Sequence, residues 1–307
     1  MKKILVALAC VATAATAVPS VASAAVAQAD LDRVAAEVTA ETGAPVGIAL
    51  HDASGTRSAG TITDFPAYST GKVPLAIAAL RHNPALTGDA TAAITVSDNA
   101  TADRLWSALG GWQATAKVNA VLRDGGSTTV NPGWWAMPSW TVADQAAFFA
   151  AIPCVDKGPE VEAMMGNVVD YQRWAFGGLP GAKIKGGWLP EHGYSLRQGA
   201  ILPVGGGWVG ASVAVRTPDN NFTRASDAAT RAANKLRPLL DNSSEPLTCA
   251  GPVQTQSAPG APTAPTAPAV PTGPIGHIAI PIPGAEALVA WANGLIDQLN
   301  VQLRRFI

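Results

Sequence analysis

The segment Tyr68-Ser69-Thr70-Gly71-Lys72-Val73-Pro74-Leu75-Ala76 places a serine at the start of an apolar run, with a lysine three residues later. The run predicts a helix, and Pro74 is compatible with its first turn. Positions three apart share one face of a helix, so the Ser69 hydroxyl and the Lys72 amine should lie side by side. Burial would lower the pKa of that amine and let it accept the serine proton. The alternative is a serine cap that merely precedes a lysine, which is common.

A second polar cluster lies in Ile94-Thr95-Val96-Ser97-Asp98-Asn99-Ala100-Thr101-Ala102. Ser97 offers a hydroxyl that can relay a proton to a leaving group, and Asn99 offers an amide that can hold a substrate carbonyl. Taken alone, the triplet at 97–99 is also an ordinary turn or capping sequence.

A third cluster, Lys185-Gly186-Gly187, lies in a strand-like run that ends at Trp188. The Lys185 amine can attract a substrate carboxylate, and the two glycines let a ligand approach the edge of the strand closely. The alternative is a hairpin with a solvated lysine.

The elements around these clusters come from both ends of the chain. Asp30 can cap a helix that Gly43 ends, and Val46–Leu50 is a candidate strand. Residues 70–174 are mainly helical in pattern. Later strands are expected at Lys183–Lys185, Leu196–Pro203 and Trp208–Val215, before a helix at 226–240. A sheet assembled from distant segments around a helical middle indicates an α+β fold.

The three clusters, in this order and with these elements, resemble the motifs of the penicillin-recognising serine hydrolases, closest to class A β-lactamases and the related D-alanyl-D-alanine peptidases. The resemblance covers most of residues 26–245, including Leu109-Gly110-Gly111. It implies an antiparallel sheet flanked by terminal helices. The gap from Ser69 to Ser97 is shorter than class A enzymes show, which implies a trimmed all-helical subdomain.

The resemblance also implies roles, and neither a cofactor nor a metal. The acyl donor would be a β-lactam or a peptidoglycan stem peptide ending in D-alanyl-D-alanine. The backbone N–H groups of Ser69 and Trp188 would form an oxyanion hole. The implied catalytic residues are Ser69 as nucleophile, Lys72 as general base and Ser97 as proton relay, and the implied substrate-binding residues are Asn99, Lys185, Gly187 and Trp188.

Two departures from the family pattern affect the expected chemistry. Position 186 is Gly where the family usually has Thr or Ser, which removes a hydroxyl that grips the substrate carboxylate. The segment from Ser127 to Trp140 contains no acid, although class A enzymes carry a deacylating Glu there. Without a base to activate water, an acyl-enzyme should persist. The sequence does not choose among the possible substitutes Glu160, Glu162, Asp144 and Glu191.

Tryptophans are the third feature of this region. They can wall a cleft and stack on sugar or acyl groups, or simply pack in the core. The candidates are Trp134, Trp135, Trp140 and Trp188.

The N-terminus has the layout of a secretory signal peptide over residues 1–24. Lys2 and Lys3 precede an apolar run that ends in small residues before Ala25. We therefore expect a secreted or cell-envelope protein. Cleavage would leave Cys154 and Cys249, and an exported pair favours a disulfide worth about 4 kcal/mol in the chain-entropy model. Two separate thiols are the alternative.

Composition divides the rest of the chain. The net charge of −1 argues against a nucleic-acid partner. Proline recurs at every third position from Pro259 to Pro274, which predicts a polyproline II linker at 250–284, after a domain at 25–249. Residues 285–307 predict an amphipathic helix that contacts a membrane or envelope surface, pairs with a partner helix, or packs on the domain.

Two functions fit these observations, and the oligomeric state stays open under both. One is an exported serine hydrolase. The other is a non-catalytic cell-envelope binding protein that retains the fold, because a fold can outlive its activity.

Overall fold

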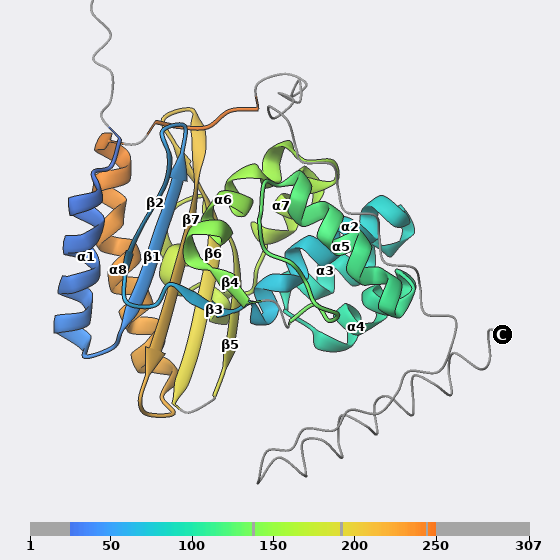
Figure 1. Ribbon diagram of the computed structural model, residues 1–307, viewed down its shortest axis with the longest axis horizontal. Coiled ribbons are helices and arrows are strands. Elements are labelled where there is room, and N and C mark those ends of the chain that lie inside the picture. The colour runs from blue at the N-terminus through green and yellow to red at the C-terminus, as the bar shows by residue number, and fades with distance from the viewer. Residues whose placement is uncertain (1–24, 137–138, 191–192, 244, 250–307) are drawn as a thin grey trace, which may run out of the picture. The chain divides into compact units, whose positions relative to one another are not determined.

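The computed structural model describes residues 25–136, 139–190, 193–243 and 245–249 (Figure 1). The predicted signal peptide (1–24), polyproline linker (250–284) and C-terminal helix (285–307) lie outside these residues and stay predictions. No helix in the described ranges is both long and apolar enough to cross a membrane.

A five-stranded antiparallel sheet forms the centre of the fold, in the order β2-β1-β7-β6-β5. Strand β1 pairs with β7, with Ile48 opposite Val213, so the sheet closes only when distant segments meet. This confirms the predicted α+β class. The strands are β1 (Val46–Asp52), β2 (Gly55–Gly60), β5 (Lys183–Leu189), β6 (Tyr194–Val204) and β7 (Gly207–Thr217).

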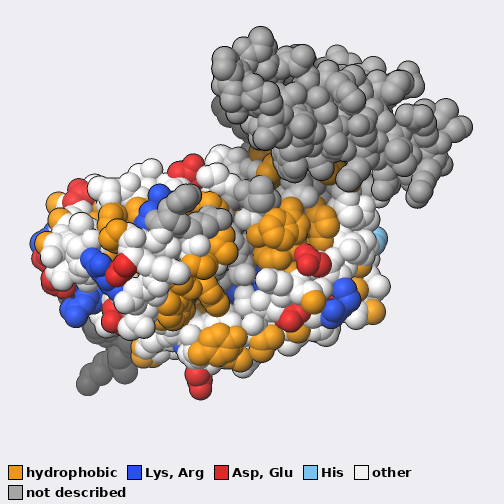
Figure 2. Space-filling model, turned by 90° about the horizontal axis from the view of Figure 1, so that it is seen from below, with side chains coloured by type: hydrophobic (Ala, Val, Ile, Leu, Met, Phe, Trp, Pro, Cys, Tyr) orange, Lys and Arg blue, Asp and Glu red, His pale blue; other side chains and the backbone are white. Residues whose placement is uncertain are grey.

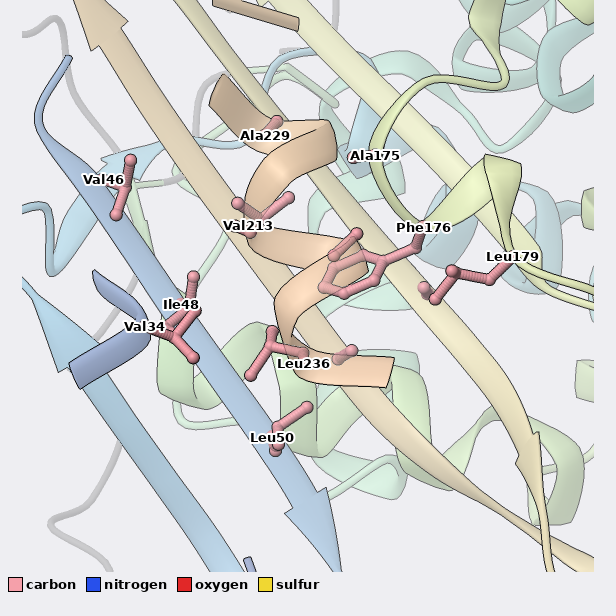
Figure 3. Close-up of a cluster of buried hydrophobic side chains, with 14 of the residues drawn as sticks. Val34, Val46, Ile48, Leu50, Ala175, Phe176, Leu179, Val213, Ala229 and Leu236 are labelled. Carbon is pink, nitrogen blue, oxygen red and sulfur yellow. The ribbon is translucent and has the colours of Figure 1, made fainter. Parts of the chain in front are cut away.

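The terminal helices α1 (Gln28–Thr42) and α8 (Phe222–Ser243) lie together on one face of the sheet (Figure 1). Figure 3 shows the apolar layer between them and the strands, where Val34, Ile48 and Leu236 are completely buried. Gly43 ends α1 in the left-handed conformation, at φ 63°. The predicted cap at Asp30 is wrong. The helix begins at Gln28, and Asp30 forms an ion pair with Arg33 in its first turn.

Helix α6 packs on the other face of the sheet, against β1 and β7, and a helical subdomain lies beyond it (Figure 1). A short ribbon of β3 (Asp64–Pro66) and β4 (Ser139–Thr141) connects the two parts. The helices of this region are α2 (Lys72–His82), α3 (Thr87–Thr95), α4 (Asn99–Ala108), α5 (Ala114–Asp124), α6 (Val142–Ala151) and α7 (Gly158–Met165). Its 3₁₀ turns are η1 (Tyr68–Gly71), η2 (Pro84–Leu86), η3 (Gly111–Gln113), η4 (Ile152–Cys154) and η5 (Asp170–Gln172). A further turn, η6 (Ala175–Gly178), packs against α8 instead.

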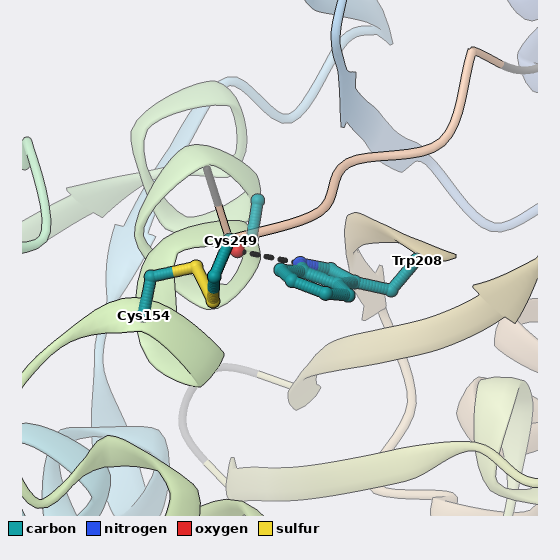
Figure 4. Close-up of a disulfide and its surroundings, with 4 residues drawn as sticks. Cys154, Trp208 and Cys249 are labelled. Atoms are coloured by element: carbon teal, nitrogen blue, oxygen red, sulfur yellow. Dashed lines mark hydrogen bonds between the residues drawn. A yellow bond between two sulfur atoms is a disulfide. The ribbon is translucent and has the colours of Figure 1, made fainter. Parts of the chain in front are cut away.

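Cys154 and Cys249 form a disulfide across a sequence separation of 95 residues, which confirms the predicted pairing (Figure 4). The Trp208 indole lies beside it and donates a hydrogen bond to the carbonyl of Ala150 at 2.7 Å. Leu247 exchanges two backbone hydrogen bonds with Trp208. The segment before Cys249 is thus fixed to the end of the β6–β7 hairpin.

Candidate active site

Ser69 lies in the short turn η1, at the junction of the sheet and the helical subdomain. The preceding residue, Tyr68, has φ 46°, a conformation that non-glycine residues rarely adopt and that often marks a functional site. Gly71 has no room for a side chain, because the carbonyl oxygen of Trp135 occupies the place of a Cβ. Lys72 follows as the first residue of α2. The Ser-x-x-Lys motif therefore spans a 3₁₀ turn and a helix start.

Lys72 joins this turn to the second motif. Its Nζ donates to the Asn99 side-chain oxygen at 2.6 Å, to the Ser97 carbonyl at 2.5 Å and to Ser97 Oγ at 3.3 Å. Ser97 has φ 59°, and Asp98 caps α4 by accepting a hydrogen bond from the Thr101 amide. The Asp98 cap and the left-handed conformation of Ser97 together orient Ser97 and Asn99 toward Lys72.

Lys185 brings the third motif to the same hydroxyl. Its Nζ donates to Ser97 Oγ at 2.8 Å and to the Gly186 carbonyl at 2.9 Å. Both lysines are completely buried. Burial lowers the pKa of Lys72 to about 8, against the opposing effect of Asp98 and Asp103. Burial and the charge of Lys72 lower the pKa of Lys185 well below its ordinary value.

Gly187 places the edge strand β5 against the nucleophile turn. A Cβ at this position would lie 2.7 Å from the Ser69 amide nitrogen and 2.8 Å from Tyr68 Cβ. The outer side of an edge strand carries backbone N–H groups that the sheet does not pair. The backbone of β5 at Gly187, the residue before Trp188, therefore lies in close contact with the Ser69 amide.

Ser69 and Asn99 line a cleft with a volume of about 340 Å³, whereas the two buried lysines lie behind its surface and do not line it. Trp134, Trp135 and Trp188 line it, as the sequence analysis proposed, whereas Trp140 is completely buried and donates to Asp144 at 2.8 Å. The whole lining consists of Pro66, Tyr68, Ser69, Asn99, Trp134, Trp135, Ala136, Trp188 and Leu189. The structure thus brings together all three predicted motifs beside an aromatic cleft.

The acids considered as substitutes for a deacylating base have other partners. Asp144 accepts hydrogen bonds from Ser127, Thr128, Thr129 and Trp140, and so holds the acid-free segment in place. Burial would raise its pKa, but the hydrogen bonds from the serine and threonines prevail and lower it. Elsewhere, Glu160 pairs with Lys157, Glu162 pairs with Lys183, and Glu191 lies outside the described residues.

Trp135 and Asp103 form a contact that was not predicted from the sequence. The Trp135 ring centroid lies 4.7 Å from Lys72 Nζ, and its indole donates to the Asp103 carboxylate at 3.0 Å. Asp103 stands four residues after Asn99 on α4, so helical spacing alone could have placed both on one face. The segment from Ser127 to Trp140, which contains no acid, therefore places an indole against Lys72.

Within the described ranges, no group of three or more His, Cys, Asp or Glu side chains is arranged to hold a metal ion. The geometry of the site is accordingly built from serine, lysine and amide groups.

No protein-family model matches the chain, and no curated protein matches its sequence. Solved structures do match its fold. A β-lactamase from Xanthomonas campestris aligns at a TM-score of 0.58 and 19% identity, covering 70% of this chain and 98% of the other. One from Sphaerobacter thermophilus gives 0.55 and 17%, covering 67% and 96%, and a class A β-lactamase from Mycobacterium abscessus gives 0.55 and 16%, covering 68% and 98%. The protein therefore has the β-lactamase-like fold, with an antiparallel sheet, terminal helices and a helical subdomain.

Proposed function

We propose that this protein is a serine hydrolase that forms an acyl-enzyme on Ser69, with β-lactams or D-alanyl-D-alanine-like peptides as acyl donors and slow deacylation. One observation carries the proposal. Lys72 and Lys185 both donate a hydrogen bond to Ser97 Oγ, close to the turn that holds Ser69. A purely structural cluster has no need of two buried lysines at one serine, because each buried charge is costly. A proton relay uses this arrangement directly.

In the proposed acylation, Ser69 Oγ attacks the carbonyl carbon of the donor while its proton passes to neutral Lys72 Nζ. The Oγ–C bond forms and the carbonyl C–N bond breaks. Ser97 gives its hydroxyl proton to the leaving nitrogen and regains one from Lys72, so no proton is left over. The backbone N–H groups of Ser69 and Trp188 would bind the developing oxyanion.

Slow deacylation follows from what surrounds the proposed ester. The lining of the cleft includes no carboxylate among the described residues, and the Trp135 indole covers Lys72. Asp144 already has several hydrogen-bond donors and a lowered pKa, so it is a poor base. Water attack on the acyl-enzyme then lacks the activation that general-base catalysis supplies, typically about 10²- to 10⁴-fold.

The test is to incubate the purified full-length chain for hours with a fluorescent penicillin and a chromogenic cephalosporin, beside Ser69→Ala. We expect a lasting label on the wild type, little chromogenic turnover, and no label on the variant. Rapid turnover would refute slow deacylation. If neither reagent reacts with the wild type, acyl-enzyme formation with β-lactams is refuted and the binding-protein alternative gains support.

We also propose that the protein is exported after cleavage at Ala24. The Cys154–Cys249 disulfide supports this, because such bonds persist in oxidising compartments. The intact mass of the native protein recovered from the culture medium or envelope should correspond to a chain that begins at Ala25. Deletion of residues 285–307 should release envelope-bound protein, and an unchanged distribution would contradict attachment through that segment.

A further inference from the structure

We propose that, among the acyl donors that Ser69 accepts, those without a carboxylate beside the reacting carbonyl, as neutral esters or amides with an apolar acyl group, react faster than those that carry one. This inference rests on the proposed acylation of Ser69 and narrows its substrate class. It comes from the side chains that fill or border the place where a substrate carboxylate would need a partner.

The first observation concerns Gly186. A Cβ at this position would lie 2.9 Å from Cζ2 of Trp174, so the indole ring already occupies the space that a Thr or Ser hydroxyl would use. Trp174 is held there by edge contacts with Trp188 and Phe222, at centroid distances of 6.4 and 6.3 Å. Its Nε1 is buried, and Trp174 is not among the residues that line the cleft.

The second observation concerns the cations. Lys72 and Lys185 have no exposed surface, and their Nζ atoms are engaged with Ser97, Asn99 and the Gly186 carbonyl. Arg216 is exposed, but its guanidinium lies 5.0 Å from the Phe65 ring centroid and it does not line the cleft. A carboxylate that entered would lose water and gain no described cation in exchange, which is unfavourable.

The third observation concerns the walls. Of the described residues that line the cleft, none is charged, and the apolar surfaces of Trp134, Trp135 and Leu189 dominate. The charged group in contact with these walls is the carboxylate of Asp103, which is negative. It accepts hydrogen bonds from the indole N–H groups of Trp135 and Trp134, at 3.0 and 3.5 Å. Hydrophobic side chains also gather across the middle of the face seen in Figure 2. Such a cleft favours a neutral, apolar group.

The chemical step is the one proposed above with a different leaving group. The Ser69 Oγ–C bond forms, the C–O bond of an ester or the C–N bond of an amide breaks, and the relayed proton leaves with the alcohol or amine. The balance of atoms and charge needs no further reactant.

The test compares benzylpenicillin with its methyl ester, which differ only in the carboxylate, as acylating agents of the full-length chain. The second-order rate of adduct formation is followed by intact mass, with Ser69→Ala as the control. The two adducts differ by one methylene in mass, so hydrolysis of the reagent cannot disguise which form reacted. We expect the ester to react at least 10-fold faster.

Equal rates, or a faster free acid, would overturn the inference while leaving acylation of Ser69 intact. If neither compound forms an adduct, the proposed function fails and the inference fails with it.

A pair of variants tests the structural cause. The double variant Trp174→Ala with Gly186→Thr should place a hydroxyl in the space that the indole leaves. Relative to Trp174→Ala alone, its ratio of the ester rate to the free-acid rate should be at least 10-fold lower. Trp112→Ala, which changes an exposed tryptophan outside the cleft lining, should leave the ratio as in the wild type. Melting curves confirm that each variant folds. An unchanged ratio in a folded double variant would contradict the role assigned to Trp174.

Discussion

At the scale of single residues, Lys72 is the proton acceptor in the proposed acylation. Its pKa of about 8 arises from burial, and the neutral amine is the form that can accept the Ser69 proton. The acylation rate should therefore rise with pH between about 7 and 9, with a midpoint near 8. Stopped-flow acylation across this range measures the profile.

Lys72→Arg is the matched control, because arginine keeps the charge and does not deprotonate. Its acylation rate should be lower by about 10²- to 10⁴-fold and independent of pH. A flat profile in the wild type would exclude Lys72 as the base.

Asp144 has a structural role at the same scale, since it organises the loop that carries Trp135. Asp144→Asn removes a charged acceptor from several donors and should lower the free energy of unfolding at pH 7 by about 2 kcal/mol. The hydrogen bonds lower its pKa in the folded state, so its contribution is fully present above the unfolded value of about 4 and is lost progressively as pH falls from there through the lowered folded-state pKa.

Urea denaturation at pH 7 and at pH 3 measures this difference. The gap between wild type and variant should be largest at pH 7 and small at pH 3. Asp32→Asn, at an exposed position on α1, should have little effect at either pH. A gap that does not depend on pH would show that the Asp144 charge is not what holds the loop.

At the scale of elements, the contact between β5 and η1 sets the site. Gly187→Ala would place a methyl group 2.7 Å from the Ser69 amide nitrogen, so the strand and the turn must move apart. A misplacement of about 1 Å in an active site can cost about 10²-fold in rate, and we expect the acylation rate to fall by about that factor. The same overpacking should cost about 1–3 kcal/mol of stability.

Gly178→Ala is the control for this substitution, because nothing lies within 4 Å of a Cβ built there. Acylation rates and thermal melting separate the two effects. Wild-type acylation in a folded Gly187→Ala would show that the close contact does not position the nucleophile.

Much of the fold could be predicted from the sequence because its elements have strong local patterns. The apolar runs that became β1, β6 and β7 identify buried strands, and Gly43 marks the end of α1. The ribbon of β3 and β4 went unpredicted, since three residues in each strand leave no period to detect. The start of α1 was missed because Ala27 occupies the cap without a side-chain hydrogen bond.

The three motifs of the candidate site could also be predicted, because each lies within one short segment of the chain. The partners of Asp144 and the contact of Trp135 with Asp103 could not, because they join loops and helices whose approach depends on the tertiary fold. The space taken by Trp174 next to Gly186 belongs to the same class. Those long-range contacts bear most directly on the proposed substrate preference and the proposed slow deacylation.

For the whole molecule, the disulfide is the main covalent constraint. Replacing Cys154 and Cys249 together with serine opens a loop of 95 residues and should lower the free energy of unfolding by about 4 kcal/mol. Denaturation with and without a reducing agent measures this. Reduced wild type should match the variant, and the variant should not respond to the reductant. Equal midpoints for oxidised wild type and variant would contradict the prediction.

The same bond also determines how the domain would carry a pulling force. A load applied between the two ends of the chain passes from Cys249 directly to Cys154, so the covalent bridge excludes residues 155–248 from the path of tension. Strands β5, β6 and β7 and helix α8 all lie in that excluded stretch. Tension on the C-terminal segment would therefore reach the molecule at the end of η4, and the strand that carries Lys185 and Gly187 would not be stretched while the disulfide is intact.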